Sequence, residues 1–147
     1  MKTISNDIFF LQVESEISEG RSVRFRVKGN SMYPLLRNNK DEVTVAPSSN
    51  VPKAMDIVLF RYKGKHILHR IIGTDGTRYI IQGDGIYTNK EQCTIEDIVG
   101  VVTIIHKNGV GQLDTSSRFF KFCSTLWYYF RFLRRYLLRA LRFVYPY

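Results

Sequence analysis

Apolar and polar residues alternate with a period of two in several short runs of the chain. SVRFRV places Val23, Phe25 and Val27 opposite Arg24 and Arg26, which is typical of a strand with one buried face. Similar runs predict five further strands at residues 42–46, 55–62, 66–73, 78–82 and 97–106. Turn sequences such as YKGK and TDGT separate neighbouring runs. Many short strands with close turns predict a mainly β fold of the barrel type.

Both ends of the chain show a helical pattern instead. Residues 6–19 predict a short amphipathic helix, with Asn6 as its cap and Gly20 as its stop. Residues 116–144 predict a second helix, in which arginines occupy one arc of about 140° and apolar side chains gather opposite. The arginines are Arg131, Arg134, Arg135, Arg139 and Arg142, and the opposite residues are Leu126, Phe130, Leu133, Leu137 and Val144.

These patterns divide the 147 residues into four parts around one domain of ordinary size. We expect an N-terminal helix in residues 1–22 and a β domain in residues 23–106. A linker follows in residues 107–117, and a basic, aromatic amphipathic helix in residues 118–147.

The positive charge of the chain is concentrated in the last of these parts. The formal net charge is +9, and residues from Arg118 onward hold seven basic side chains and no acidic one. We expect residues 118–147 to lie on an anionic membrane surface. The alternatives are packing of the apolar side on the protein itself or on a partner, and binding of nucleic acid, which the nearly neutral remainder disfavours. A membrane span is disfavoured too, because each central arginine costs about 2.5–3.5 kcal/mol.

The N-terminal sequence MKTISNDIFFLQVESE lacks the long apolar core of a secretion signal. We therefore expect a cytoplasmic protein, peripheral at the inner face of the membrane. Cys93 and Cys123 show no CxxC spacing, which predicts neither a disulfide framework nor a zinc site. His66 and His69 are three apart on one predicted strand, so they point to opposite faces. We expect no cofactor and no metal.

A candidate nucleophile lies in KGNSMYPLLRNNKDEV, residues 28–43, where a glycine-led bend holds Ser31. A serine hydroxyl reacts only when a base takes its proton, and a neutral imidazole is suited to that task near neutral pH. The three histidines are His66, His69 and His106, and their spacing does not choose among them. A purely structural turn is the alternative for the serine.

Four segments, taken in order, resemble the sequence boxes of signal peptidase I and of the LexA-type self-cleaving repressors. GNSMYPLL resembles the nucleophile box, MDIVLF the next box, HRIIG the box that supplies the base, and IIQGDG the last box. Together they cover about residues 23–102. In HRIIG, His69 precedes Arg70, whereas the common bacterial signal peptidases have Lys followed by Arg. This pair is similar to the Ser/His enzymes of the endoplasmic reticulum, also found in archaea and some spore-forming bacteria.

The resemblance implies roles for individual residues. Ser31 would be the nucleophile, His69 its general base, and the Ser31 backbone N–H a donor to the oxyanion. Asp84 is our candidate for orienting His69. The Ser/His enzymes have a further Asp a few residues later, where this chain has YTNKE, so a Ser/His dyad is the alternative.

The function that the resemblance implies is that of a serine endopeptidase. Its substrates would be leader or signal-like peptides, bound in an extended form and cut near small residues. The alternative is a catalytically degenerate module of the same fold, which would bind extended peptides or the membrane surface without cutting.

Overall fold

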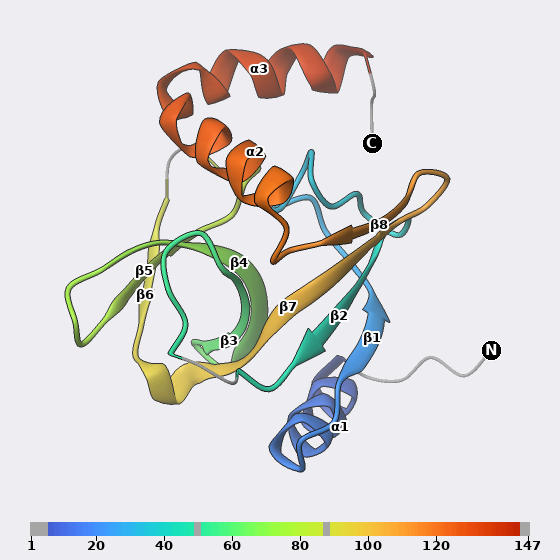
Figure 1. The fold of residues 1–147 in the computed structure, drawn as a ribbon, viewed down its shortest axis with the longest axis vertical. Helices are drawn as coiled ribbons and strands as arrows, with labels where there is room; N and C mark the ends of the chain where they lie inside the picture. Colours follow the sequence, from blue (N-terminus) through green and yellow to red (C-terminus); the bar gives the residue numbers. More distant parts are fainter. Residues whose placement is uncertain (1–5, 49–50, 87–88, 145–147) are drawn as a thin grey trace.

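A computed structural model describes residues 6–48, 51–86 and 89–144 (Figure 1). Within these residues, eight antiparallel strands form one open sheet in the order β1-β2-β7-β3-β4-β5-β6, with β8 paired to β7. The prediction of a mainly β fold is confirmed. The strands are β1 (Val23–Arg26), β2 (Glu42–Ala46), β3 (Ile57–Tyr62), β4 (Lys65–Thr74), β5 (Tyr79–Gln82), β6 (Glu91–Cys93), β7 (Ile98–Lys107) and β8 (Gly111–Asp114).

Helices lie at the two ends of this body (Figure 1). The helix α1 (Asn6–Ser18) packs at one end, and Gly20, with φ 87°, follows it as predicted. The predicted Asn6 cap falls outside the described side chains. A short 3-10 turn η1 (Ile95–Asp97) precedes β7. At the other end lie α2 (Arg118–Tyr129) and α3 (Arg131–Val144).

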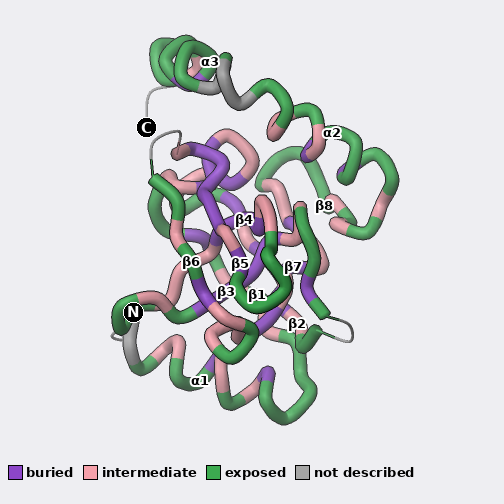
Figure 2. The backbone as a smooth tube through the Cα atoms, turned by 90° about the vertical axis from the view of Figure 1, so that its left-hand side faces the viewer, coloured by how far each residue is buried: buried purple, intermediate pink, exposed green. Residues whose placement is uncertain are grey.

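The sheet coils because its long strands contain irregular pairings. Opposite Leu59 and Phe60 of β3, the strand β7 has the extra residue Val99, and opposite β5 the strand β4 has the extra residue Ile72. Such bulges bend a strand and increase its twist. The central strand β3 is buried on both faces over Ile57–Phe60 (Figure 2). Its alternate residues therefore contribute to two hydrophobic clusters. Ile57 and Leu59 belong to one, and Val58 and Phe60 to the other.

Two parts of the chain differ from the sequence prediction. The expected linker, residues 107–117, contains β8, because Gly109 and Gly111 adopt positive φ angles of 82° and 126° and turn the chain back onto β7. The single expected C-terminal helix is two helices. The first, α2, is capped at its start by Ser117, whose hydroxyl accepts a hydrogen bond from the Phe120 N–H, and at its end by Phe130.

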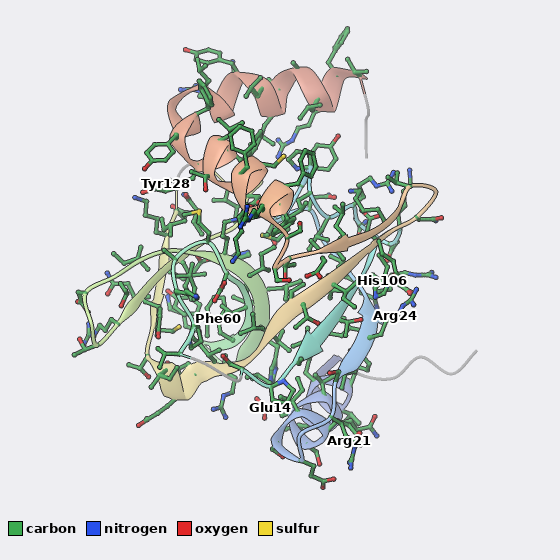
Figure 3. All side chains as sticks on the ribbon, viewed as in Figure 1. Glu14, Arg21, Arg24, Phe60, His106 and Tyr128 are labelled. Atoms are coloured by element: carbon green, nitrogen blue, oxygen red, sulfur yellow. The ribbon has the colours of Figure 1, made fainter. Side chains whose placement is uncertain are left out.

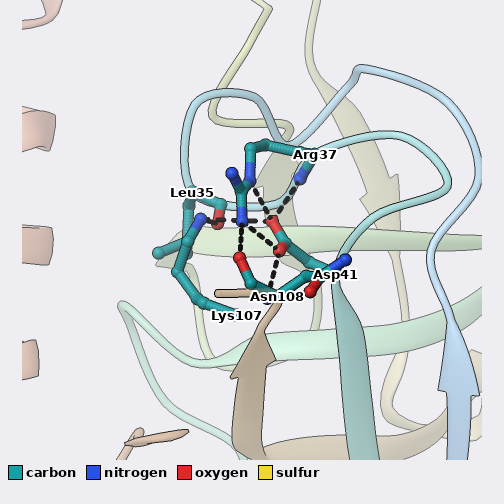
Figure 4. A network of polar contacts seen from close by, with 5 residues as sticks. All are labelled: Leu35, Arg37, Asp41, Lys107 and Asn108. Atoms are coloured by element: carbon teal, nitrogen blue, oxygen red, sulfur yellow. Dashed lines mark hydrogen bonds and ion pairs between the residues drawn. The ribbon is translucent and has the colours of Figure 1, made fainter. Parts of the chain in front are cut away.

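A buried carboxylate fixes the long loop between β1 and β2 (Figure 4). The side chain of Asp41 is fully buried and accepts hydrogen bonds from the backbone and guanidinium of Arg37, from Lys107 Nζ and from the Asn108 N–H, at 2.8–3.1 Å. Lys107 also donates to the carbonyl of Leu35. Burial alone would raise the pKa of Asp41, but the bonds from Arg37, Asn108 and Lys107 outweigh it and hold the pKa well below its usual range. The loop is thereby tied to the end of β7.

Replacement of this carboxylate by an amide should destabilise the protein. We expect Asp41→Asn to lower the free energy of unfolding by about 3–5 kcal/mol at neutral pH, because Arg37 and Lys107 lose a buried charge partner. The depressed pKa means that the wild-type contribution is complete above the unfolded value of about 3.9 and declines as the pH falls toward the folded value. Urea unfolding at a series of pH values should show the difference shrinking in acid.

The exposed Glu96 provides the matched control. Glu96→Gln removes the same charge and should change the free energy of unfolding by less than about 0.5 kcal/mol. Equal unfolding curves for Asp41→Asn and wild type at neutral pH would contradict the assigned role of Asp41.

Candidate active site

Ser31 lies in a compact turn after β1 and is half-buried. Gly29 adopts φ 88°, a value that favours glycine, and its N–H donates to Asn38 Oδ1 at 2.8 Å. The Tyr33 N–H donates to the carbonyl of Asn30 at 3.0 Å. Two local contacts thus hold the glycine-led bend that the sequence predicted.

A second loop, residues 83–85, packs directly on this turn. The Gly85 N–H donates to the carbonyl of Ser31 at 2.8 Å. A side-chain carbon at Gly83 would overlap that carbonyl oxygen and would lie 3.0 Å from His69 Nε2. At Gly85 it would lie 2.6 Å from the carbonyl of Asn30. Both glycines are therefore required by the close approach of the two loops, and the Ser31 turn and the His69 ring converge on Gly83.

The structure distinguishes the three histidines. His69, on β4, is buried and lies at this convergence. His66 pairs with Glu14 of α1 at 2.8 Å and stacks on Phe10. His106 contacts Thr44 Oγ1 at 2.8 Å, and both Glu14 and His106 are labelled in Figure 3. The other two rings thus have their own partners, and His69 is the candidate base nearest Ser31.

The carboxylate beside His69 is Glu91, which the sequence analysis did not select. Glu91 Oε1 lies 3.2 Å from His69 Nδ1, at ion-pair distance but without the alignment of a good hydrogen bond. Glu91 comes from β6, which pairs with β5 beside β4. The sequence did contain a signal for it, because Glu91 is the acidic residue of YTNKE, the segment in which the Ser/His enzymes have their further Asp.

Asp84 has a different partner. Its two carboxylate oxygens accept hydrogen bonds from Arg70 Nε and Nη2, both at 2.8 Å, and the side chains of this pair are 3% and 5% exposed. Arg70 Nη1 also donates to the carbonyl of Met55. The described contacts therefore do not place the Asp84 carboxylate on His69. Through its ion pair with Arg70, the Asp84 carboxylate instead ties the 83–85 loop to β4.

The helix α2 covers this ion pair. The Phe120 ring lies 5.7 Å from the Arg70 guanidinium, and Trp127 Nε1 donates to the backbone carbonyl of Asp84 at 3.1 Å. Met32, next to Ser31, is buried and its sulfur accepts from the Asp84 N–H at 3.3 Å. The 83–85 loop is thus held by the Ser31 turn on one side and by α2 on another.

The environment of His69 favours the neutral ring. Burial is the main cause and lowers the pKa of His69 below its ordinary value, while the negative charges of Glu91 and Asp84 oppose that shift. A neutral imidazole with its proton on Nδ1, toward Glu91, has a free lone pair on Nε2, the nitrogen that faces Gly83. In the described part of the chain no hydrogen bond joins the Ser31 hydroxyl to His69. Catalytic hydrogen bonds commonly tighten only when substrate binds.

The arrangement contains the three kinds of group that acyl transfer uses: a hydroxyl on a tight turn, a buried neutral imidazole and a carboxylate behind it. A family model described as signal peptidase, peptidase S26, matches residues 18–112, which is more than half of the chain. A comparison with curated proteins gives no match. The matched residues include Ser31, His69, Asp84 and Glu91, and the predicted resemblance to signal peptidases is confirmed. The chain therefore belongs to the signal peptidase family, peptidase S26.

Proposed function

We propose that this peptidase of the signal peptidase kind is a serine endopeptidase that cleaves leader or signal-like peptides with Ser31 and His69. The observation that supports the proposal most directly is the convergence of the Ser31 turn and His69 Nε2 on Gly83. A purely structural serine turn does not need a buried, neutral imidazole at that point. Glu91, on the far side of the ring, supplies the negative charge that an imidazolium requires.

The proposed reaction is acyl transfer in two steps. His69 Nε2 takes the proton of Ser31 Oγ as this oxygen attacks the scissile carbonyl, and the Ser31 N–H helps to hold the resulting oxyanion. His69 then gives the proton to the departing amine, so the peptide bond breaks and an acyl-enzyme forms. Water, deprotonated by His69, hydrolyses this ester and restores the Ser31 hydroxyl. Glu91 stabilises the imidazolium during both steps.

The proposed substrate is a peptide in an extended conformation, cut after small residues. Among the described strands, β1 lies at one end of the sheet order and pairs only with β2. It ends at Arg26, shortly before the Ser31 turn. An unpaired strand edge can add an extended peptide through backbone hydrogen bonds, which supports a peptide substrate whose recognition depends little on its sequence outside the cut.

Cleavage of a diverse peptide library, followed by mass spectrometry, tests this function. We expect wild type to cut after small residues and both Ser31→Ala and His69→Ala to lose about 10⁴-fold or more in rate, because the nucleophile and its base act as one unit. His66→Ala is the matched control, since His66 contacts Glu14 and Phe10. This variant should retain the cleavage pattern of the wild type.

Cuts that persist in both the Ser31 and His69 variants would refute the assignment. Absence of any cut by wild type, together with binding of the same peptides, would favour the non-catalytic peptide-binding module.

Two carboxylate variants distinguish the proposed roles of Glu91 and Asp84. We expect Glu91→Gln to lower kcat by roughly 10²–10⁴-fold with an unchanged unfolding temperature, because the imidazolium loses its counter-charge. We expect Asp84→Asn to cost about 3–5 kcal/mol of stability, because Arg70 is left buried without its partner. Steady-state kinetics and thermal unfolding of both variants give the comparison. If Glu91→Gln is fully active and Asp84→Asn is stable but inactive, the residue that orients His69 is Asp84 rather than Glu91.

The pH dependence of kcat/KM should follow the titration of His69. The ring must be neutral to accept a proton, and its pKa is lowered by burial, so the acidic limb should lie below the ordinary histidine value of about 6.5. Because Glu91 raises the pKa of His69, Glu91→Gln should move the titration to still lower pH. NMR titration of the His69 ring in both proteins checks the sign. An acidic limb above that value would contradict the neutral-base assignment.

A further inference from the structure

The helix α3 turns an apolar face to the solvent. Five of its large apolar side chains are exposed by 40–90%: Leu133, Tyr136, Leu137, Phe143 and Val144. Their helical spacing places them together on one side. Among the described side chains of α3, Leu138 is buried, and it lies three and four residues from Arg135 and Arg142 and so shares their side. The apolar face is therefore directed away from the buried side of the helix.

The helix α2 likewise has one buried side and one exposed apolar side. Phe120 and Ser124 are buried on the side that covers the Arg70–Asp84 pair. The opposite side exposes Phe119, Phe122, Leu126 and Tyr129 by 72%, 62%, 40% and 66%. Figures 1 and 2 show both helices at one end of the molecule, beyond the sheet. Exposed apolar area of this extent usually marks an interaction surface.

The charge of these helices indicates the kind of partner. Residues 118–144 contain seven basic side chains and no acidic one. Among the described ones, Arg135, Arg139 and Arg142 are exposed on α3, and helical spacing places Arg139 beside Phe143 at the edge of the apolar face. A second copy of these helices would bring like charges together. A nucleic acid would satisfy the arginines but not the exposed phenylalanines and leucines.

We propose that α2 and α3, the C-terminal helical pair, bind the surface of an anionic lipid bilayer. The apolar faces lie at the boundary between headgroups and acyl chains, and the arginines contact the anionic headgroups. No helix in the described part of the chain is long and apolar enough to cross a bilayer. The proposed mode of binding is interfacial, with the helices lying along the surface.

The C-terminal helical pair would also hold the 83–85 loop, and with it the Ser31 turn, close to the bilayer. The Trp127 indole on α2 donates to the carbonyl of Asp84, and Asp84 lies between the two glycines that pack on the Ser31 turn. A peptide that emerges from the membrane surface would thus have only a short distance to span before it reaches Ser31. The membrane proposal itself rests on the exposed faces and the charge, and its test does not depend on peptidase activity.

Sedimentation of the full chain with lipid vesicles tests the proposal. We expect binding to vesicles of phosphatidylcholine mixed with phosphatidylglycerol and much weaker binding to phosphatidylcholine alone. Arg135→Gln with Arg139→Gln should lower the partition coefficient about fivefold for each arginine removed, and added salt should diminish this difference. Leu137→Ser with Phe143→Ser should lower it about tenfold or more, since less apolar area is inserted.

Matched variants on the body control for charge and apolarity. Lys63→Gln with Lys65→Gln removes two exposed charges from the hairpin formed by β3 and β4, and Ile95→Ser with Val110→Ser removes two exposed apolar side chains. Both controls should bind vesicles as wild type does. Thermal unfolding of every variant, expected to match wild type, verifies that each is folded.

Three outcomes would overturn the proposal. The first is equal sedimentation with and without vesicles. The second is tight, steeply salt-dependent binding of RNA or DNA that Arg135→Gln with Arg139→Gln abolishes and that excludes vesicles. The third is a concentration-dependent dimer in analytical ultracentrifugation that Leu137→Ser with Phe143→Ser dissociates, which would make a second copy the occupant of the apolar faces.

Discussion

The contact between the 83–85 loop and the Ser31 turn is the constraint on which the site depends. Two backbones meet there with no room for a side chain at Gly83 or Gly85, and the Gly85 N–H bonds to the Ser31 carbonyl. A buried carboxylate fixes each of these two segments through an ion pair: Asp41 fixes the Ser31 turn, and Asp84 fixes the 83–85 loop. Buried ion pairs of this kind contribute modestly to net stability, and their removal leaves an uncompensated charge. In the Ser31 turn this polar anchor adds to apolar packing, because Met32 and Leu36 belong to the hydrophobic core.

The sequence predicted most of the sheet because its strands are half-buried and alternate visibly. It did not predict β6, since three residues are too short to show a period. It treated β8 as linker, although Asn108–Gly109 is a good turn signal. The break at Phe130 has no glycine or proline to mark it. Helical periodicity identified an apolar face on the C-terminal segment, but only the packing shows that nothing in the described part of the protein covers it.

In the site too, features set by neighbouring residues could be predicted from the sequence, whereas features set by the three-dimensional fold could not. The turn around Ser31 and the strand position of His69 are local, and the sequence placed both. The choice among carboxylates is spatial. Asp84 lies close to His69 along the sheet, yet Arg70, adjacent to His69 in the chain, takes both of its oxygens. Glu91 reaches the ring because β6 pairs with β5, which no spacing of residues reveals.

The location of Glu91 on β6 has a consequence for how the protein responds to mild stress. This strand has three residues, lies at the end of the sheet order and, in the described part of the chain, pairs only with β5. Short edge strands open at a lower free energy than the strands of the core. Opening of β6 would withdraw Glu91 from His69 while β3, β4 and β7 stay folded. Under the proposed mechanism, heat or denaturant would then abolish peptide cleavage before the global unfolding transition, and the loss would reverse as soon as the strand closed.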